Sequence, residues 1–261
     1  MLLDVNKLEE KDFKNTYTEI FAQADTWEEV YGLYEERKSE IEKFLSNFDK
    51  DTKVIFTGAG TSEYVGNIAC DYLKSHGHFD FESIATTDLV SAPYLHFKKD
   101  VKTVLVSFAR SGNSPESIAA VKLGDQIVDD FYNLAITCAH DGKLAVDLKD
   151  DPNSYVFLNP EITNDKGFAM TNSFSSMLLA TLLIFDTSLD NKKEIVDKLS
   201  KIARNTYEKA GEIEKLIDFD FDRVAYLGSG PLGKLTKEAR LKILELTAGE
   251  VVTIFDSSMG F

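Results

Sequence analysis

Two segments rich in glycine and hydroxyl side chains could hold a phosphate group. The first is Gly58-Ala-Gly-Thr-Ser62 and the second is Arg110-Ser-Gly-Asn-Ser114; each follows an apolar run. Glycine lets backbone N–H groups approach a ligand closely, and the N-terminus of a helix attracts anions. Three small polar side chains and a cation around one glycine favour a phosphate monoester at the second segment. For the first segment alone, a tight turn that caps a helix is an equal alternative.

Short apolar runs alternate with helical patterns from residue 53 onward and must position these segments. The expected strands cover residues 54–57, 81–86, 103–107, 133–138 and 155–158. Strands that are apolar on both faces are typical of a parallel sheet covered by helices. We therefore expect an α/β fold, a doubly wound, Rossmann-like sheet of the flavodoxin type. The carboxyl ends of its strands meet at one edge, so both segments should converge on one ligand.

The flanking parts of the chain are expected to be helical. In residues 1–50, Thr26-Trp-Glu-Glu29 has the form of a capping box, which predicts a helix start at Thr26. The helix that follows carries aromatic residues at helical spacing and a charged break at residues 35–38; it could pack on its own domain or form a partner surface. Residues 171–217 predict two helices with a break near 186–191.

An internal repeat suggests a duplicated domain. Val54-Ile-Phe-Thr-Gly-Ala-Gly60 is echoed by Val224-Ala-Tyr-Leu-Gly-Ser-Gly230, and Ile84-Ala-Thr-Thr-Asp88 by Val252-Thr-Ile-Phe-Asp256. We expect a helical segment over 1–50, a first domain over 51–190, and a linker helix with the start of a second domain over 191–261. Because the second copy stops before its third strand, the chain is expected to be a fragment of a longer protein.

A dinucleotide site is the main competing interpretation of the glycines. Gly228-Ser-Gly-Pro-Leu-Gly233 matches GxGxxG, and Glu250 and Asp256 lie near the distance of the usual acidic partner. However, Glu63 stands where the first repeat needs its third glycine. Pro231 also removes an N–H that a pyrophosphate would use. A single phosphate group is therefore favoured.

Composition excludes several functional classes. The net charge is −15, from 44 acidic and 29 basic residues, without a basic run, so we expect no nucleic-acid partner. The start of the chain is charged too early for a signal peptide, and no apolar stretch reaches the ~20 residues of a membrane helix. A cytoplasmic protein without a membrane partner is expected. Cys70 and Cys138 are isolated, and no His, Asp and Glu cluster has metal-ligand spacing, so neither a metal nor another cofactor is expected.

The two segments resemble the phosphate loops of the sugar isomerase (SIS) domain family. Residues 60–62 match its GTS motif and residues 111–114 its SGx[ST] motif. Gly167-Phe-Ala-Met-Thr-Asn-Ser-Phe174 resembles the segment before a long helix that lines the same pocket. The runs 106–117 and 164–171 are most similar to the galactosamine-6-phosphate deaminase branch, also called tagatose-6-phosphate ketose/aldose isomerase. The resemblance extends from about residue 15 to the end.

The resemblance implies a set of substrate-binding residues. The phosphate contacts would come from Gly60, Thr61, Ser62, Ser107, Arg110, Ser111, Gly112, Asn113 and Ser114. The pocket would be lined by Ala169, Met170, Thr171 and Asn172. In the similar loop of the isomerase half of glucosamine-6-phosphate synthase, a glutamine stands in place of Arg110 and a serine in place of Ala109, so one hydroxyl is missing here. Arg110 or Ser107 is expected to compensate.

The resemblance also implies the chemistry. Leu241-Lys-Ile-Leu-Glu-Leu-Thr247 resembles the helix that carries the family's catalytic glutamate. On this match Glu245 moves a proton between C1 and C2 of the sugar, with Lys242 one turn before it on the same face. The family's ring-opening histidine is expected after Phe261, so residues 1–261 alone should be inactive. A homodimer or tetramer is expected.

The expected reaction converts an amino sugar phosphate such as galactosamine-6-phosphate to a ketohexose phosphate, with release of ammonia. Simple aldose/ketose isomerisation without deamination stays open, as does the choice between galacto and gluco substrates. A non-catalytic phosphosugar-binding regulator is a further alternative. Such regulators usually carry a basic DNA-binding unit, and the acidic first 50 residues contain none.

Overall fold

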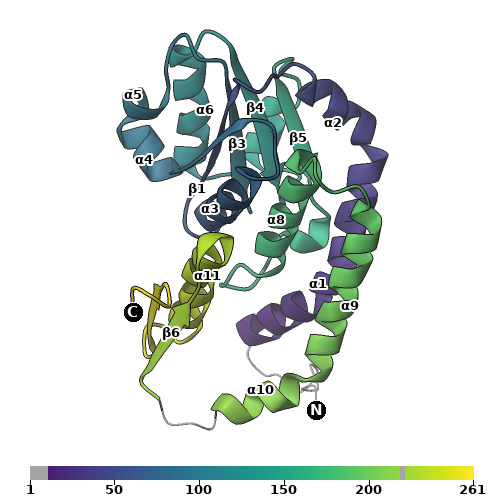
Figure 1. The fold of residues 1–261 in the computed structure, drawn as a ribbon, viewed down its shortest axis with the longest axis vertical. Coiled ribbons are helices and arrows are strands. Elements are labelled where there is room, and N and C mark those ends of the chain that lie inside the picture. The colour runs from purple at the N-terminus through teal and green to yellow at the C-terminus, as the bar shows by residue number, and fades with distance from the viewer. Residues whose placement is uncertain (1–10, 218–220) are drawn as a thin grey trace.

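A five-stranded, all-parallel sheet forms the centre of the larger part of the protein (Figure 1), in a computed structural model that describes residues 11–217 and 221–261. Its strands are β1 Lys53–Gly58, β2 Asp80–Ala85, β3 Thr103–Ala109, β4 Phe131–Thr137 and β5 Ser154–Leu158. Their order is β2-β1-β3-β4-β5, which confirms the doubly wound arrangement. The early charged residues Asp4 and Lys7, used above against a signal peptide, lie outside the described residues.

Helices cover both faces of this sheet. They are α3 Thr61–Leu73, α4 Thr86–Ser91, α5 Pro93–His96, α6 Pro115–Ile127, α7 Lys143–Leu148 and α8 Asn172–Phe185, with a short 3-10 turn at Glu161–Thr163. Successive strand residues point to opposite faces. Val54 and Phe56 therefore join a core with α3 and α8, whereas Ile55 joins a second core with α4, α6 and α7. Apolar residues on both faces are what made these strands predictable.

The N-terminal helix starts earlier than the capping-box pattern predicted. Helix α1 spans Lys11–Glu36, so Thr26 lies inside it and its Oγ1 donates to the Ala22 carbonyl at 3.0 Å. The prediction of a helix start at Thr26 is wrong because residues before it also bury an apolar face. Phe21, for example, packs edge-on against Tyr207, with ring centroids 4.8 Å apart. The predicted break is confirmed, since α2 begins at Lys38 and ends at Leu45.

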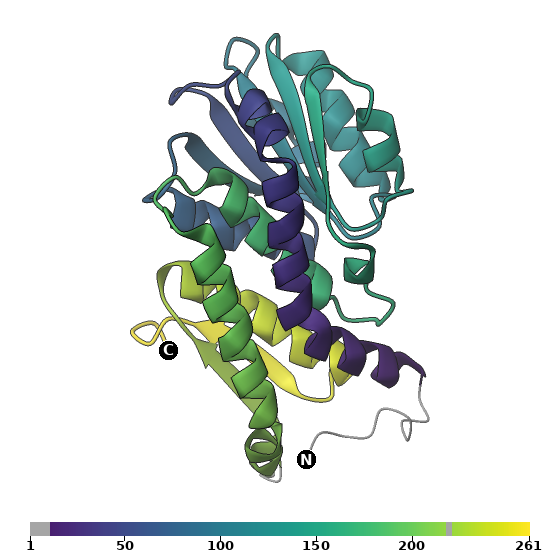
Figure 2. The ribbon, with the colours of Figure 1, turned by 90° about the vertical axis from the view of Figure 1, so that its right-hand side faces the viewer.

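Two helices lead from the sheet to the C-terminal part. Helix α9 (Lys192–Glu208) follows α8 after the predicted break, and α10 (Ala210–Ile217) continues it. Helix α1 lies alongside α8 and α9 (Figure 2), so its apolar face packs within its own chain. In the part of the chain that the structure describes, no helix has the length and apolar character required to cross a membrane.

The C-terminal part repeats the element order found at the start of the sheet. Strand β6 (Arg223–Leu227), helix α11 (Gly230–Leu246) and strand β7 (Val252–Asp256) form a parallel β-α-β unit, as β1, α3 and β2 do. The two strand-to-helix loops also share a backbone conformation, with φ of 59° at Gly60 and 58° at Gly230. Helix α11 packs against α3, which joins the two units (Figure 1).

Candidate functional site

The two predicted phosphate loops leave adjacent strands. In the register between β1 and β3, Thr57 pairs with Ser107, so both loops begin at the same edge of the sheet. The chain moves to β2 on one side of β1 and to β4 on the other side of β3. This point is where the strand order reverses, and open α/β sheets bind ligands outside the strand ends at such a point.

The first loop is built so that backbone N–H groups at the start of α3 face outward. A Cβ on Gly58 would lie 2.4 Å from the Ser62 carbonyl carbon, so the loop closes tightly only with glycine there. Gly60 has a positive φ of 59°, which side chains rarely adopt. Thr61 and Ser62 are both buried in the first turn of α3. The loop therefore presents the N-terminus of a thirteen-residue helix.

The second loop is held in shape by its neighbours. Gly112 has a φ of 64°, and its carbonyl accepts a hydrogen bond from Leu144 N at 2.9 Å. The Asn113 side-chain oxygen accepts from Lys143 N at 3.0 Å, so it fixes the start of α7. Gly142 packs so closely that a Cβ there would lie 2.4 Å from the Ser111 carbonyl oxygen. Asn113 is thus a structural support of the loop as well as a predicted ligand.

Three serine hydroxyls lie in this loop or in the strand that leads to it. Ser111 is exposed, and Asn113 N, at 3.4 Å, is the one hydrogen-bond partner of its Oγ among the described residues. The Ser114 hydroxyl lies 2.7 Å from that of Ser117, at the start of α6. The Ser107 hydroxyl is buried and has no hydrogen-bond partner among the described residues. Ser107 and Ser111 are therefore free to bond a ligand.

Arg110 connects the second loop to the segment before α8. Its Nη1 donates to the Gly167 carbonyl at 3.3 Å. The Glu19 carboxylate of α1 lies nearby and accepts the Lys166 and Gly167 N–H groups at 2.6 and 3.0 Å. Burial raises the pKa of Glu19, while these backbone bonds and Arg110 oppose that rise. One N–H group of Arg110 is therefore already used to hold this segment.

The predicted pocket residues differ in their surroundings. Ala169 is fully buried, and Met170 packs against the main core. Thr171 N donates to Asp165 Oδ2 at 2.9 Å, whereas the buried Thr171 hydroxyl has no partner among the described residues. Asn172 is also fully buried, and its Nδ2 donates to the Thr26 hydroxyl at 3.1 Å. Asn172 therefore holds α8 against α1.

The two predicted catalytic residues lie beside the first loop. Lys242 Nζ is 2.8 Å from Glu245 Oε2 and 3.0 Å from the Thr61 hydroxyl. A third oxygen, Glu238 Oε1, lies 3.0 Å from the same ammonium and accepts from Thr61 at 3.2 Å. The structure thus brings a pair of residues late in the sequence to the N-terminus of α3.

Glu238 was not among the predicted site residues. It is buried, with 3% of its surface exposed. Its spacing contains a usable signal, because Glu238, Lys242 and Glu245 follow the i, i+4, i+7 pattern of one helix face. The resemblance singled out only the last two.

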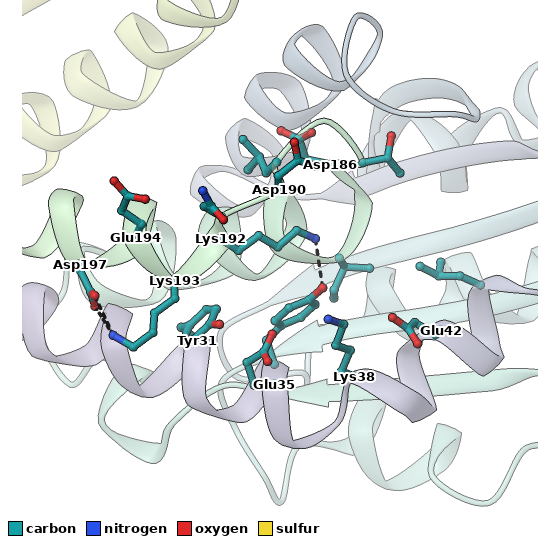
Figure 3. Close-up of a pocket in the computed structure, with 16 residues that line it drawn as sticks. Tyr31, Glu35, Lys38, Glu42, Asp186, Asp190, Lys192, Lys193, Glu194 and Asp197 are labelled. Atoms are coloured by element: carbon teal, nitrogen blue, oxygen red, sulfur yellow. Dashed lines mark hydrogen bonds and ion pairs between the residues drawn. The ribbon is translucent and has the colours of Figure 1, made fainter.

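A cavity of about 820 Å³ lies elsewhere, between α1, α2 and the turn from α8 to α9 (Figure 3). It contains charged side chains of both signs, among them Glu35, Lys38 and Lys192. Lys192 Nζ donates to the Tyr34 hydroxyl at 3.0 Å, and burial lowers the pKa of Lys192. None of the predicted site residues lines this cavity.

A parallel sheet with hydroxyl-bearing loops at its reversal point defines an α/β domain suited to phosphorylated ligands. A D-galactosamine-6-phosphate deaminase AgaS from Shewanella sp. (strain ANA-3) is 39% identical over 100% of this chain and 68% of its own length. The crystal structure of tagatose-6-phosphate ketose/aldose isomerase from Escherichia coli is 35% identical, with a TM-score of 0.90 over 95% of this chain and 68% of that one.

The chain belongs to the D-galactosamine-6-phosphate deaminase AgaS family, within the SIS-domain proteins. It spans about two thirds of the length of its curated relatives, 68% and 65% for two of them. The C-terminal domain of glucosamine-fructose-6-phosphate aminotransferase from Francisella tularensis shares the fold, with a TM-score of 0.72 at 16% identity over 97% of this chain and 71% of that one. No protein-family model matches the chain.

Proposed function

We propose that this protein is a sugar-phosphate isomerase and deaminase that converts galactosamine-6-phosphate to tagatose-6-phosphate and ammonia. One observation carries the proposal: the Lys242–Glu245 pair is hydrogen-bonded to Thr61, in one of two hydroxyl-bearing loops that leave adjacent strands. An acid–base pair therefore lies next to a candidate phosphate site. The names of the relatives support the same substrate class.

The phosphate binds at the N-termini of α3 and α6 in this proposal. Backbone N–H groups and the hydroxyls of Ser62, Ser111 and Ser114 surround it, and helix dipoles favour its charge. The amino sugar reacts in its open form, with an aldehyde at C1 and an amine at C2. The remaining pocket wall in this proposal comes from residues 169–172, of which Thr171 has a hydroxyl with no partner among the described residues.

Glu245 transfers the proton in the central step. Its carboxylate removes the proton from C2, and the electron pair forms a C1–C2 double bond while the aldehyde oxygen takes up a proton. Returning the proton to C1 leaves a hydroxymethyl group at C1 and an imine at C2. Water then adds to C2 and ammonia leaves, which yields the ketose. A positioned carboxylate contributes typically ~10²–10⁴-fold to such a step.

Simple aldose–ketose isomerisation is the second candidate, because the E. coli structure with a TM-score of 0.90 is named as an isomerase. Both reactions share the proton transfer and differ in whether nitrogen leaves C2. We further propose that the second β-α-β unit is the start of a second SIS domain and that the protein acts as a dimer or tetramer. The cytoplasm is its proposed location, since charged sugar phosphates do not cross membranes unaided.

The test is an assay of the full-length protein with galactosamine-6-phosphate and glucosamine-6-phosphate, in which ammonia and ketose are measured separately. We expect ammonia and ketose in equal amounts from the galacto substrate. Glu245→Gln should lower turnover by at least ~100-fold with the protein still folded. Glu250→Gln, an exposed change beyond the same helix, should leave turnover unchanged. If the protein instead forms a ketose from sugar phosphates that carry no amino group, without release of ammonia, simple aldose–ketose isomerisation is favoured.

A further inference from the structure

We infer that Glu238 is a positioning residue: it fixes Lys242, and through it Glu245, against the first phosphate loop. The inference rests on the proposed function, in which Glu245 is the base. Neither the phosphate loops nor the proton transfer requires a second carboxylate at this place. Glu238 and Lys242 nevertheless both form hydrogen bonds from α11 to Thr61, the first residue of α3.

Lys242 is held in one defined position between two carboxylates. An ammonium group has three N–H donors. Three oxygens lie within 3.0 Å of Lys242 Nζ: Glu245 Oε2, Glu238 Oε1 and the Thr61 hydroxyl. All three donors are therefore used within the protein.

Glu238 also links this ammonium to the loop. Thr61 donates its hydroxyl proton to Glu238 Oε1 at 3.2 Å while it accepts from Lys242. Glu238 Oε1 thus receives two hydrogen bonds, one from each helix. If this oxygen were removed, Lys242 would keep Glu245 and Thr61, but α11 would lose one of its two hydrogen bonds to Thr61 and Lys242 would lose one of its three acceptors.

Keeping Glu238 in this place has a cost in stability. The side chain is buried, and its Oε2 has no hydrogen-bond partner among the described residues. Burial raises the pKa of Glu238, and the Lys242 charge opposes that rise. A buried carboxylate with an unpaired oxygen is unfavourable for stability. Its presence is understandable if it serves the geometry of the site.

Other charged groups near α11 have separate partners. Asp71 of α3 lies 3.8 Å from Lys234, and Glu63 of α3 accepts from Asn67. Asp256 of β7 accepts from Ser257 N. The further titratable or charged groups on the packed elements are Tyr64, Cys70, Tyr72, Arg223, Tyr226, Lys237 and Arg240. Glu238 is therefore the second carboxylate that shares the ammonium bound to Glu245.

The experiment compares Glu238→Gln and Glu238→Ala with Glu250→Gln as the matched control in the full-length protein. Glutamine keeps an acceptor for Thr61 and Lys242 but removes the charge. We expect kcat to fall ~10-fold with KM within ~2-fold. For Glu238→Ala, which also loses the geometry, a ~100-fold fall is expected.

A second measurement does not depend on turnover. The rate of reductive methylation of Lys242, followed by mass spectrometry on the folded protein, should rise ~10-fold in Glu238→Ala because one N–H donor is released. It should rise less in Glu238→Gln and not at all in the control.

The two proposals fail in different ways. If the wild type forms neither ammonia nor ketose, or if Glu245→Gln turns over normally, the proposed function is wrong, and the methylation rates still test the positioning. If Glu245→Gln is inactive but Glu238→Gln keeps the wild-type kcat, the inference about Glu238 is overturned. Unchanged protection of Lys242 in Glu238→Ala also overturns it.

Discussion

Two buried carboxylates, those of Glu19 and Asp165, hold the segment that precedes α8. Glu19 accepts two backbone N–H groups from residues 166 and 167, and Asp165 Oδ2 accepts three hydrogen bonds, from Thr171 N, Ser173 N and the Ser173 hydroxyl. A carboxylate that accepts several backbone N–H groups fixes a loop without regular secondary structure. These contacts fix Thr171 at the start of α8, and Arg110 of the second phosphate loop bonds the same segment at the Gly167 carbonyl.

Glu19 should give the protein a pH-dependent stability. Because burial raises the pKa of Glu19 above its ordinary value of 4.5, the folded state holds more protons than the unfolded state between that value and the raised one. The contribution of Glu19 to the free energy of unfolding is therefore largest below this window and falls as pH rises through it. Glu19→Gln should flatten this slope in urea titrations at several pH values. An unchanged slope in Glu19→Gln would contradict the assignment.

At the residue scale, the sequence predicted where the glycines and hydroxyls of the two loops lie better than it predicted the hydrogen-bond partners of the site residues. The glycine pattern located both loops because positive φ and close packing require glycine there. Asn172 was predicted as pocket lining, but its amide bonds Thr26 on another helix. Glu238 was missed although its spacing to Lys242 and Glu245 places the three on one helix face, because its contact with Thr61 joins residues far apart in the sequence. Contacts between distant segments leave no local pattern.

At the scale of elements, side chains of α1 hold α8 in place through hydrogen bonds and close packing, a contact called the α1–α8 clamp below. Trp27 Nε1 donates to the Ser175 hydroxyl at 2.9 Å, and that hydroxyl donates to Gln23 Oε1 at 2.6 Å. The close approach continues at Gly167, where a Cβ would lie 2.5 Å from Thr16 Oγ1 and 2.7 Å from Glu19 Oε2. The pocket segment can therefore pack on α1 only without a side chain at this position.

Two glycine substitutions test the α1–α8 clamp. Gly167→Ala should lower the free energy of unfolding by ~1–3 kcal/mol, because Thr16 and Glu19 must shift. Gly32 lies in α1 itself, and a Cβ there would meet no atom within 4 Å. Gly32→Ala should therefore raise the free energy of unfolding by ~0.5–1 kcal/mol. Urea denaturation measures both. Equal effects of the two substitutions would show that the contact at Gly167 does not constrain the fold.

The strands were predictable as elements, whereas the start of α1 was not. Residues 103–107 are buried on both faces of the sheet, and a short run of this apolar character between turn residues is typical of a central parallel strand. The position of Thr26 in α1 instead depends on packing against α8 and α9, which outweighs the local capping signal. The packing of α11 on α3 likewise depends on residues from both units.

For the whole molecule, the central question is how a chain with a net charge of −15 retains an anionic substrate. In the proposed function, backbone N–H groups and hydroxyls at two helix N-termini bind the phosphate locally. The reversal of strand order between β1 and β3 places those termini together. The packing of α11 on α3 then brings Glu245 to the same place.

The most direct test of this local binding is a crystal structure of the protein with galactosamine-6-phosphate. We expect the phosphate to lie within hydrogen-bond distance of Ser62 and Ser111, beyond the ends of β1 and β3, with C2 of the sugar directed toward Glu245. A phosphate bound instead in the cavity around Lys192, or at the start of α11 beside Lys234, would contradict the proposed function.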